Sequence, residues 1–269
     1  MTKAASNTTG RQITGSTLKI IAMVCMLIDH IGAVIVERAL IANGYVEAAN
    51  ASEEALTTFL QSHMGLYVAD MIMRAIGRVS FPIFCFLLIE GFLHTHDVKK
   101  YALNLGIFAL ISEIPFNLAF KGDWKDLTYQ NVFFTLFLGL LMMILLREIE
   151  RRYSHSNMLS SLLKILVILA FAGIAWLLRS DYNAMGILCI GIMYNVRQSK
   201  MACIGIGCAV LTLVSLSELT CFLAMIPVYL YNGERGLKMK YAFYAFYPVH
   251  LLLLFLIACA MGMGGVVML

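Results

Sequence analysis

Long, unbroken apolar stretches are the feature of this sequence that most constrains its fold. Leu, Ile, Met and Phe follow one another over roughly twenty residues at a time, without the alternation of apolar and polar residues that barrel strands show. Only helices and closed barrels cross lipid, because no backbone polar group is left unpaired there. The pattern therefore predicts an all-α integral membrane protein.

The composition supports this prediction. Of 269 residues, 61% are hydrophobic and 13% are charged, whereas a soluble domain is about half apolar and about a quarter charged. The net charge of +4 is too weak to indicate a nucleic-acid partner. The seven cysteines lie inside apolar stretches without metal-ligand spacing, so we expect small core residues and no metal site.

The number of spans follows from counting apolar stretches. We expect about nine transmembrane helices, although the sixth to eighth stretches are short for a membrane span. No linker or change in composition divides the chain, so residues 1–16 are predicted to be a polar cytoplasmic N-terminus and 17–269 a single transmembrane domain. The nine stretches are 19–41, 67–94, 99–120, 129–147, 160–179, 182–196, 201–216, 218–232 and 241–262.

The distribution of Lys and Arg predicts the orientation. With the N-terminus in the cytoplasm, most basic residues fall on the inner side, while the first outer loop is acidic. This arrangement predicts a multi-pass protein of the cytoplasmic (inner) membrane, in contact with its lipids. The inner residues would be Lys3, Arg11, Lys19, Lys99, Lys100, Arg147, Arg151, Arg152, Lys164, Arg197, Lys200, Arg235, Lys238 and Lys240.

Lys19, Asp29 and His30 form the sharpest candidate site, in the first predicted span. Lys19 and His30 are about three helical turns plus roughly 20° apart, so they share one face, with about 16 Å between them. Lys19 would lie at the cytoplasmic headgroups and His30 near mid-membrane, where a charge costs roughly 2.5–3.5 kcal/mol. This predicts a site that an anionic ligand enters from the cytosol. The alternative is a His–Asp pair that stabilises helix packing.

Further candidates lie in other spans. Tyr247 and His250 are one turn apart around Pro248, which frees a backbone carbonyl. They would complete the site, and a packed, hydrogen-bonded histidine is the alternative. Arg78 and Asn131 are candidates for contacts with a cofactor or a developing oxyanion.

Structural roles are open for the last two residues as well. Arg78, with Arg74, could form buried ion pairs to Glu90 and Glu113, and Asn131 could cap a helix. A histidine near mid-membrane that is oriented by a carboxylate can be a general base for acyl transfer or a proton relay in a transporter. These residues alone leave the reaction class open.

Separate blocks of residues, in a fixed order, add a family resemblance. They include LKIIA at 18–22, MLIDHIG at 26–32, ISEIPFN at 111–117 and FYPVHL at 246–251, with further matches at 74–78, 81–84, 90–92, 131–136, 181–186 and 232–236. Over about residues 17 to 255 the chain resembles the TraX family, known from the membrane acetylase of conjugative F-type pilin.

The resemblance implies an acetyltransferase that uses acetyl-CoA, related to the wider transmembrane acyltransferase superfamily. In that superfamily a basic residue, ten intervening residues and a histidine recur in one early helix. Lys19 and His30 match this spacing, with Lys where the sugar O-acetylases usually have Arg. Lysine keeps the charge but lacks the guanidinium fork.

Three functional hypotheses follow. In the first, acetyl-CoA enters from the cytosol and His30 is the general base, with Asp29 orienting the site, and the acceptor is a small membrane protein such as pilin, a glycan or a lipid. The second is a proton-coupled transporter or permease that uses Asp29 and His30. The third is a membrane assembly protein without catalytic activity.

Overall fold

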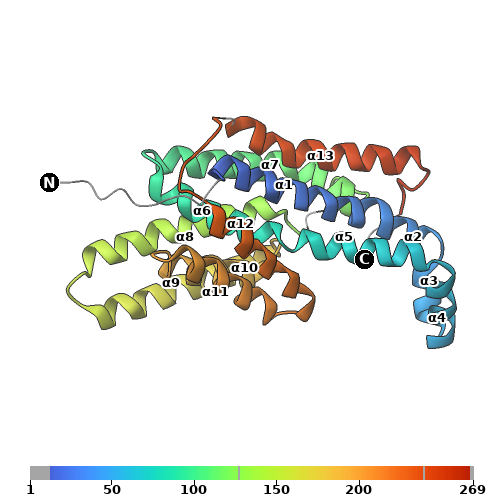
Figure 1. Cartoon of the computed structure of the whole chain (residues 1–269), viewed down its shortest axis with the longest axis horizontal. Helices are drawn as coiled ribbons and strands as arrows, with labels where there is room; N and C mark the ends of the chain where they lie inside the picture. Colours follow the sequence, from blue (N-terminus) through green and yellow to red (C-terminus); the bar gives the residue numbers. More distant parts are fainter. Residues whose placement is uncertain (1–12, 127, 239, 267–269) are drawn as a thin grey trace.

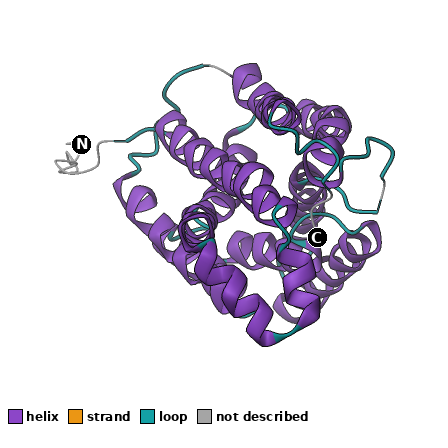
Figure 2. Ribbon diagram, turned by 90° about the vertical axis from the view of Figure 1, so that its right-hand side faces the viewer, coloured by secondary structure: helices purple, strands orange, loops and turns teal. Residues whose placement is uncertain are grey.

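The computed structural model describes residues 13–126, 128–238 and 240–266, and almost all of this part is helical (Figures 1 and 2). Within it there is no strand, although two isolated bridges occur, Ile13–Tyr231 and Gln130–Ser180. The helices are α1 Gly15–Ile31, η1 Gly32–Glu37, α2 Arg38–Ala42, α3 Tyr45–Ala51, α4 Glu53–Ser62, α5 Met64–Gly77, α6 Ser80–His94, α7 Val98–Lys121, α8 Val132–Arg152, α9 Asn157–Leu178, α10 Asn183–Asn195, α11 Lys200–Thr212, η2 Leu216–Ala224, α12 Met225–Leu230 and α13 Lys240–Ala260. The predicted helical fold is confirmed.

Six helical stretches of the described chain are long and apolar enough to cross a membrane, so this is a multi-pass membrane protein. Where the sequence predicts the sixth to eighth spans, the helices are shorter. α10 and α11 have 13 residues each, which is about 20 Å of helix against about 30 Å of hydrocarbon. The count of nine and the cytoplasmic N-terminus therefore stay predictions. The six stretches are Gly15–Ala42, Met64–His94, Val98–Lys121, Val132–Arg152, Met158–Leu178 and Lys240–Ala260.

The bundle is arranged around α6. The buried side chains of this helix point in several directions. They include Phe81, Ile83, Phe86 and Phe92. α13 packs along α7 and touches α1 on one side, whereas on the other side α9 and α10 pack on each other and on α8, and α11 packs on α10 (Figure 1). α9 is the most exposed of the six long stretches, as expected for a helix that faces lipid.

Two glycines set the approach of α5 to the first helix. A Cβ on Gly77 would overlap the Asp29 side chain, and one on Gly32 would lie 2.9 Å from the Met73 Cβ. Because both positions lack a side chain, the two helices approach closely. After His30 and Ile31 the helix widens into the π-helical turn η1, a distortion that is frequent at functional sites.

Candidate functional site

A pocket of about 450 Å³ lies between α1, α6, α7 and α13. Its mouth is at the end of the bundle where α1, α7 and α13 begin, since Gly15, Lys19, Lys100 and Lys240 line it there. Its inner end is apolar and aromatic, formed by Phe133, Leu136, Tyr244 and Tyr247, among others. The pocket therefore runs from a polar rim into the interior of the bundle.

The rim of this pocket is rich in cations. Lys19, Lys100, Arg235 and Lys240 line it, against the carboxylates of Glu90 and Asp97. The Lys19 ammonium lies 5.2 Å from the centre of the Phe243 ring, a cation–π distance. With four cations against two carboxylates, the mouth favours an anionic ligand.

The segment 231–237 holds Arg235 at the mouth by bonding to the start of α1. Gly15 N donates to Glu234 O at 2.7 Å and Ser16 N to Arg235 O at 3.0 Å, so the carbonyls of the loop satisfy the free amides of the helix N-terminus. Gly236 has φ +72°, and a Cβ there would overlap Ser16 and Thr14. Glycine at this position allows the loop to close on the helix.

Tyr231 joins this loop to α6. Its hydroxyl donates to Glu90 Oε2 at 3.4 Å, and the Lys200 ammonium lies 4.6 Å from the centre of its ring. Burial, with the nearby Glu90 carboxylate, raises the pKa of Tyr231 to about 12. The phenol is therefore protonated at neutral pH and remains a donor to Glu90.

His30 and His250 meet in the interior of the bundle, beyond the inner end of the pocket. His30 Nδ1 lies 2.7 Å from His250 Nε2, and His250 Nδ1 lies 2.7 Å from the carbonyl oxygen of Phe246. Both histidines are buried. The structure thus brings together two predicted site residues that are far apart in the sequence.

Tyr247 stands between the pocket and the histidines. Its ring centre is 5.9 Å from that of His30 and 5.7 Å from that of His250, with both rings edge-on, and Phe133 lies 5.2 Å away. Tyr247 lines the pocket. One aromatic ring therefore separates the cavity from His30 in this conformation.

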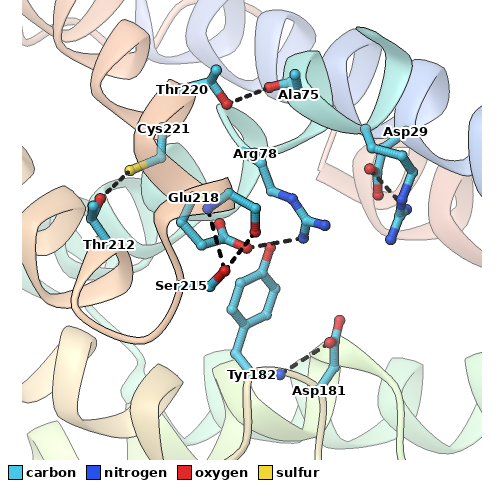
Figure 3. Close-up of polar contacts among 12 residues, drawn as sticks. Asp29, Ala75, Arg78, Asp181, Tyr182, Thr212, Ser215, Glu218, Thr220 and Cys221 are labelled. Carbon is cyan, nitrogen blue, oxygen red and sulfur yellow. Dashed lines mark hydrogen bonds and ion pairs between the residues drawn. The ribbon is translucent and has the colours of Figure 1, made fainter. Parts of the chain in front are cut away.

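Asp29 faces another way, and the structure does not bring it to His30. Its carboxylate pairs with the Arg74 guanidinium at 2.8 Å (Figure 3), beside Gly77 of α5. Neighbouring helix positions point about 100° apart, so Asp29 meets α5 while His30 meets α13. The partner of His30 is His250.

Arg78 also lies away from the pocket. Its guanidinium pairs with Glu218 at 3.0 Å, and the Tyr182 ring lies beside them (Figure 3). The expected ion pairs of Arg74 and Arg78 with Glu90 and Glu113 are thus replaced by pairs with Asp29 and Glu218. The sequence did not identify Glu218 as the partner of Arg78, because no pattern in residues 216–224 links the two.

Asn131 has the structural role that the sequence left open. Its side-chain oxygen accepts from Phe133 N at 3.0 Å as the N-cap of α8, and its amide donates to Glu113 Oε2 at 2.5 Å and to Ala109 O at 2.8 Å. The bonds of its amide group tie α8 to α7. They do not aim the side chain at the pocket, although Val132 and Phe133 beside it line the inner end.

The loop around Asp181 has a strained backbone, which the sequence did not indicate. Arg179, Tyr182 and Asn183 have φ of 50°, 59° and 48°, a strained conformation for non-glycine residues that concentrates at functional sites. Asp181 Oδ1 accepts from Tyr129 Oη at 3.0 Å and from Tyr182 N at 3.0 Å. Burial raises the pKa of Asp181. In the sequence, this loop was marked by the block at 181–186 that resembles the TraX family.

No group of three or more potential metal ligands occurs among the residues that the structure describes.

Comparison with known proteins identifies the family. The model of the family described as "TraX protein" matches residues 14–258, which is most of the chain. The chain is 30% identical over 209 residues to the "Probable fimbrial assembly protein FimC, serogroup H1" of Dichelobacter nodosus, covering 68% of this chain and 81% of that protein. No solved structure matches. The pocket, the two histidines and the Asp29–Arg74 pair thus lie within the matched region, and this chain belongs to the TraX family.

Proposed function

We propose that this protein is an acetyltransferase of the bacterial cytoplasmic membrane. It would transfer the acetyl group of cytosolic acetyl-CoA to an amine or hydroxyl of an envelope molecule. The observation that carries the proposal is a pocket with a cationic mouth whose inner end lies one aromatic ring from a buried pair of histidines.

The two ends of the pocket suit the two ends of acetyl-CoA. The phosphates would lie at the mouth beside Lys19, Arg235 and Lys240, where charge-assisted hydrogen bonds are strongest. The less polar arm that carries the thioester would extend along the apolar walls towards Tyr247. Because Tyr247 closes the inner end, its ring would turn aside for the thioester to reach His30.

His30 would act as the general base. Its free ring nitrogen would take the proton from the acceptor amine or hydroxyl as the acceptor attacks the carbonyl carbon of the thioester. The C–S bond then breaks, the acceptor keeps the acetyl group, and His30 returns the proton to the sulfur of CoA. Placing the base and the thioester in one dry site would contribute proximity as well as proton transfer.

The acceptor is inferred from the name of a relative alone. The relative from Dichelobacter nodosus is named as a fimbrial assembly protein, which favours a small fimbrial subunit over a glycan or a lipid. Intact-mass spectrometry of small membrane proteins, glycans and lipids, with and without this protein, would identify the acceptor. A gain of one acetyl group is expected on one of the three classes.

Activity is tested with the purified full chain in lipid nanodiscs. We expect turnover of acetyl-CoA, by transfer or by slow hydrolysis, and loss of turnover in His30→Ala with acetyl-CoA binding retained. His155→Ala, an exposed histidine in the α8–α9 loop, is the matched control. Wild-type turnover in His30→Ala would refute the assignment of the base.

A second candidate is a membrane assembly protein that binds a fimbrial subunit without chemistry. The name of the same relative supports it. It predicts that a small subunit co-purifies with this protein at unchanged mass, and that acetyl-CoA does not bind.

A further inference from the structure

The ring–ring hydrogen bond between His30 and His250 has a direction that can be worked out atom by atom. His250 Nδ1 has the carbonyl oxygen of Phe246 as its partner, at 2.7 Å. A carbonyl oxygen can only accept, so His250 Nδ1 carries the proton and donates. In the neutral imidazole the other nitrogen, His250 Nε2, then has a lone pair and accepts.

The same reasoning passes to the second ring. His30 Nδ1 lies 2.7 Å from His250 Nε2, and because Nε2 accepts, His30 Nδ1 must carry the proton. The neutral His30 ring is then unprotonated at Nε2. The carbonyl of Phe246 thus determines which nitrogen carries the proton in both rings. Two hydrogen bonds connect it to the His30 ring, whose Nε2 has the free lone pair.

The geometry of the rings agrees with a strong bond. Their planes differ by 7° and their centres are 5.0 Å apart. This separation exceeds the 2.7 Å N–N distance by about two ring radii, so the bond lies along the line of centres and in both planes. The lone pair of an imidazole nitrogen also lies in the ring plane, which makes the contact close to linear.

Three aromatic rings hold the pair in this orientation. Phe246 stacks on His250 with ring centres 4.7 Å apart, Phe120 meets His30 edge-on at 5.7 Å, and Tyr247 meets both. Neither ring can turn over without moving these neighbours. The rotamers, and with them the choice of nitrogen, are therefore locked by packing.

The charges around the pair favour the neutral state. No carboxylate among the described residues makes a hydrogen bond or an ion pair with either ring. A positive charge on the His250 ring and the charge of Arg74 would both disfavour a second proton on His30. An imidazolium here would be buried without a counter-ion and near a cation, which is costly.

We infer that His250 is a positioning residue that selects the Nδ1–H tautomer of His30 and so presents His30 Nε2 as the proton acceptor for acyl transfer. The carbonyl of Phe246 anchors this relay. The catalytic consequence rests on the proposed function, but the tautomer does not. His250 takes the place that the sequence had assigned to Asp29.

The tautomers are measured by ¹⁵N NMR of the full chain in nanodiscs, with histidine labelled at both ring nitrogens. The signals of the two rings are assigned by their loss in His30→Ala and His250→Gln. We expect both rings to be protonated at Nδ1 and unprotonated at Nε2, with no substrate present. A His30 ring protonated at Nε2 in the wild-type protein would overturn the inference.

Two substitutions of His250 separate positioning from packing. His250→Gln keeps an oxygen acceptor near the place of Nε2, whereas His250→Leu fills the space without one. We expect His30 to keep its Nδ1–H tautomer in His250→Gln and to lose it in His250→Leu. Equal spectra of His30 in both variants would contradict a positioning role.

Kinetics give an independent readout. The value of kcat should fall roughly 10²-fold in His250→Leu and by less in His250→Gln, with the KM for acetyl-CoA nearly unchanged in both. His155→Gln is the control for a distant histidine. If the tautomers are as expected and the wild-type protein is inactive, the relay stands and the proposed function fails. If the wild type is active and His250→Leu is equally active, the function stands and the relay fails.

Discussion

Two polar side chains at neighbouring positions of α1, Asp29 and His30, are stabilised in different ways. Asp29 pairs with Arg74, and close by Arg78 pairs with Glu218, so opposite full charges neutralise each other. His30 instead bonds to a second histidine, and that ring bonds to a backbone carbonyl. Asp29 is stabilised by an opposite charge, whereas the neutral His30 is stabilised by a hydrogen bond alone.

This difference indicates which group is suited to chemistry. In the ion pairs each charge is held by its partner, and removal of one partner leaves the other uncompensated. In the histidine pair these two hydrogen bonds use three of the four ring nitrogens. The fourth, His30 Nε2, keeps a lone pair that can accept a proton. We therefore assign the arginine pairs to stability and the histidine pair to reaction. The following predictions test that division, from the largest effect to the smallest.

Removing the base should abolish turnover and leave the fold intact. His30→Ala is expected to lower kcat by roughly 10²–10⁴-fold, the usual contribution of a general base. Its melting temperature in nanodiscs should fall only modestly, because the variant leaves a cavity and one neutral acceptor, His250 Nε2, unpaired but no uncompensated charge. Acetyl-CoA turnover and thermal unfolding are measured on the same samples. A large loss of stability without loss of turnover per folded molecule would contradict the division, because His30 would then serve stability and not the reaction.

Breaking an ion pair should do the reverse. Glu218→Ala leaves Arg78 without its partner, and the side chains are 23% and 12% exposed, so we expect about 3 kcal/mol of destabilisation, at the lower end of the range for buried pairs. The double variant Arg78→Leu/Glu218→Leu should be less destabilised than Glu218→Ala, because no charge is left unpaired. Unfolding of Arg78→Leu, Glu218→Leu and the double variant, in a double-mutant cycle, checks this. Additive effects of the single variants would argue against a coupled pair.

Removing one cation from the mouth should weaken binding of the donor. Lys19→Ala is expected to raise the Kd for acetyl-CoA roughly tenfold, as loss of one hydrogen bond to a charged group does, and the effect should shrink as salt is added. Lys125→Ala, in the loop that follows the C-terminal end of α7 and so away from the mouth, is the matched control. Titration calorimetry gives both affinities. Equal Kd values in the two variants would place the donor elsewhere.

The smallest effect concerns the hydrogen bond between Tyr231 and Glu90. Tyr231→Phe removes a donor to Glu90 at 3.4 Å, so we expect a loss of about 1 kcal/mol in unfolding free energy. Because the pKa of Tyr231 is about 12, the phenol is a donor throughout the range below that value, and the difference between variant and wild type should not change between pH 6 and 9. A pH-dependent difference would mean that another group titrates in this contact.

Some of these features follow from the sequence, and others do not. The apolar stretches predict membrane helices because the bilayer leaves the backbone no other choice, and the Lys19–His30 spacing follows from helical periodicity. The contact of His30 with His250 joins residues 220 positions apart, which local periodicity cannot supply. The same holds for Arg78 with Glu218. Asp29 was assigned to His30 because they are adjacent, whereas adjacent helix residues point in different directions.

The central claim is that a thioester reaches His30 from the basic end of the pocket. The most direct measurement is a structure of the full chain in nanodiscs with a non-reactive analogue of acetyl-CoA in which the thioester sulfur is replaced. The account predicts phosphates beside Lys19, Arg235 and Lys240, the ring of Tyr247 turned aside, and the acetyl carbonyl next to His30. An analogue bound outside this pocket, or with its acetyl group closer to Arg78 than to His30, would contradict it.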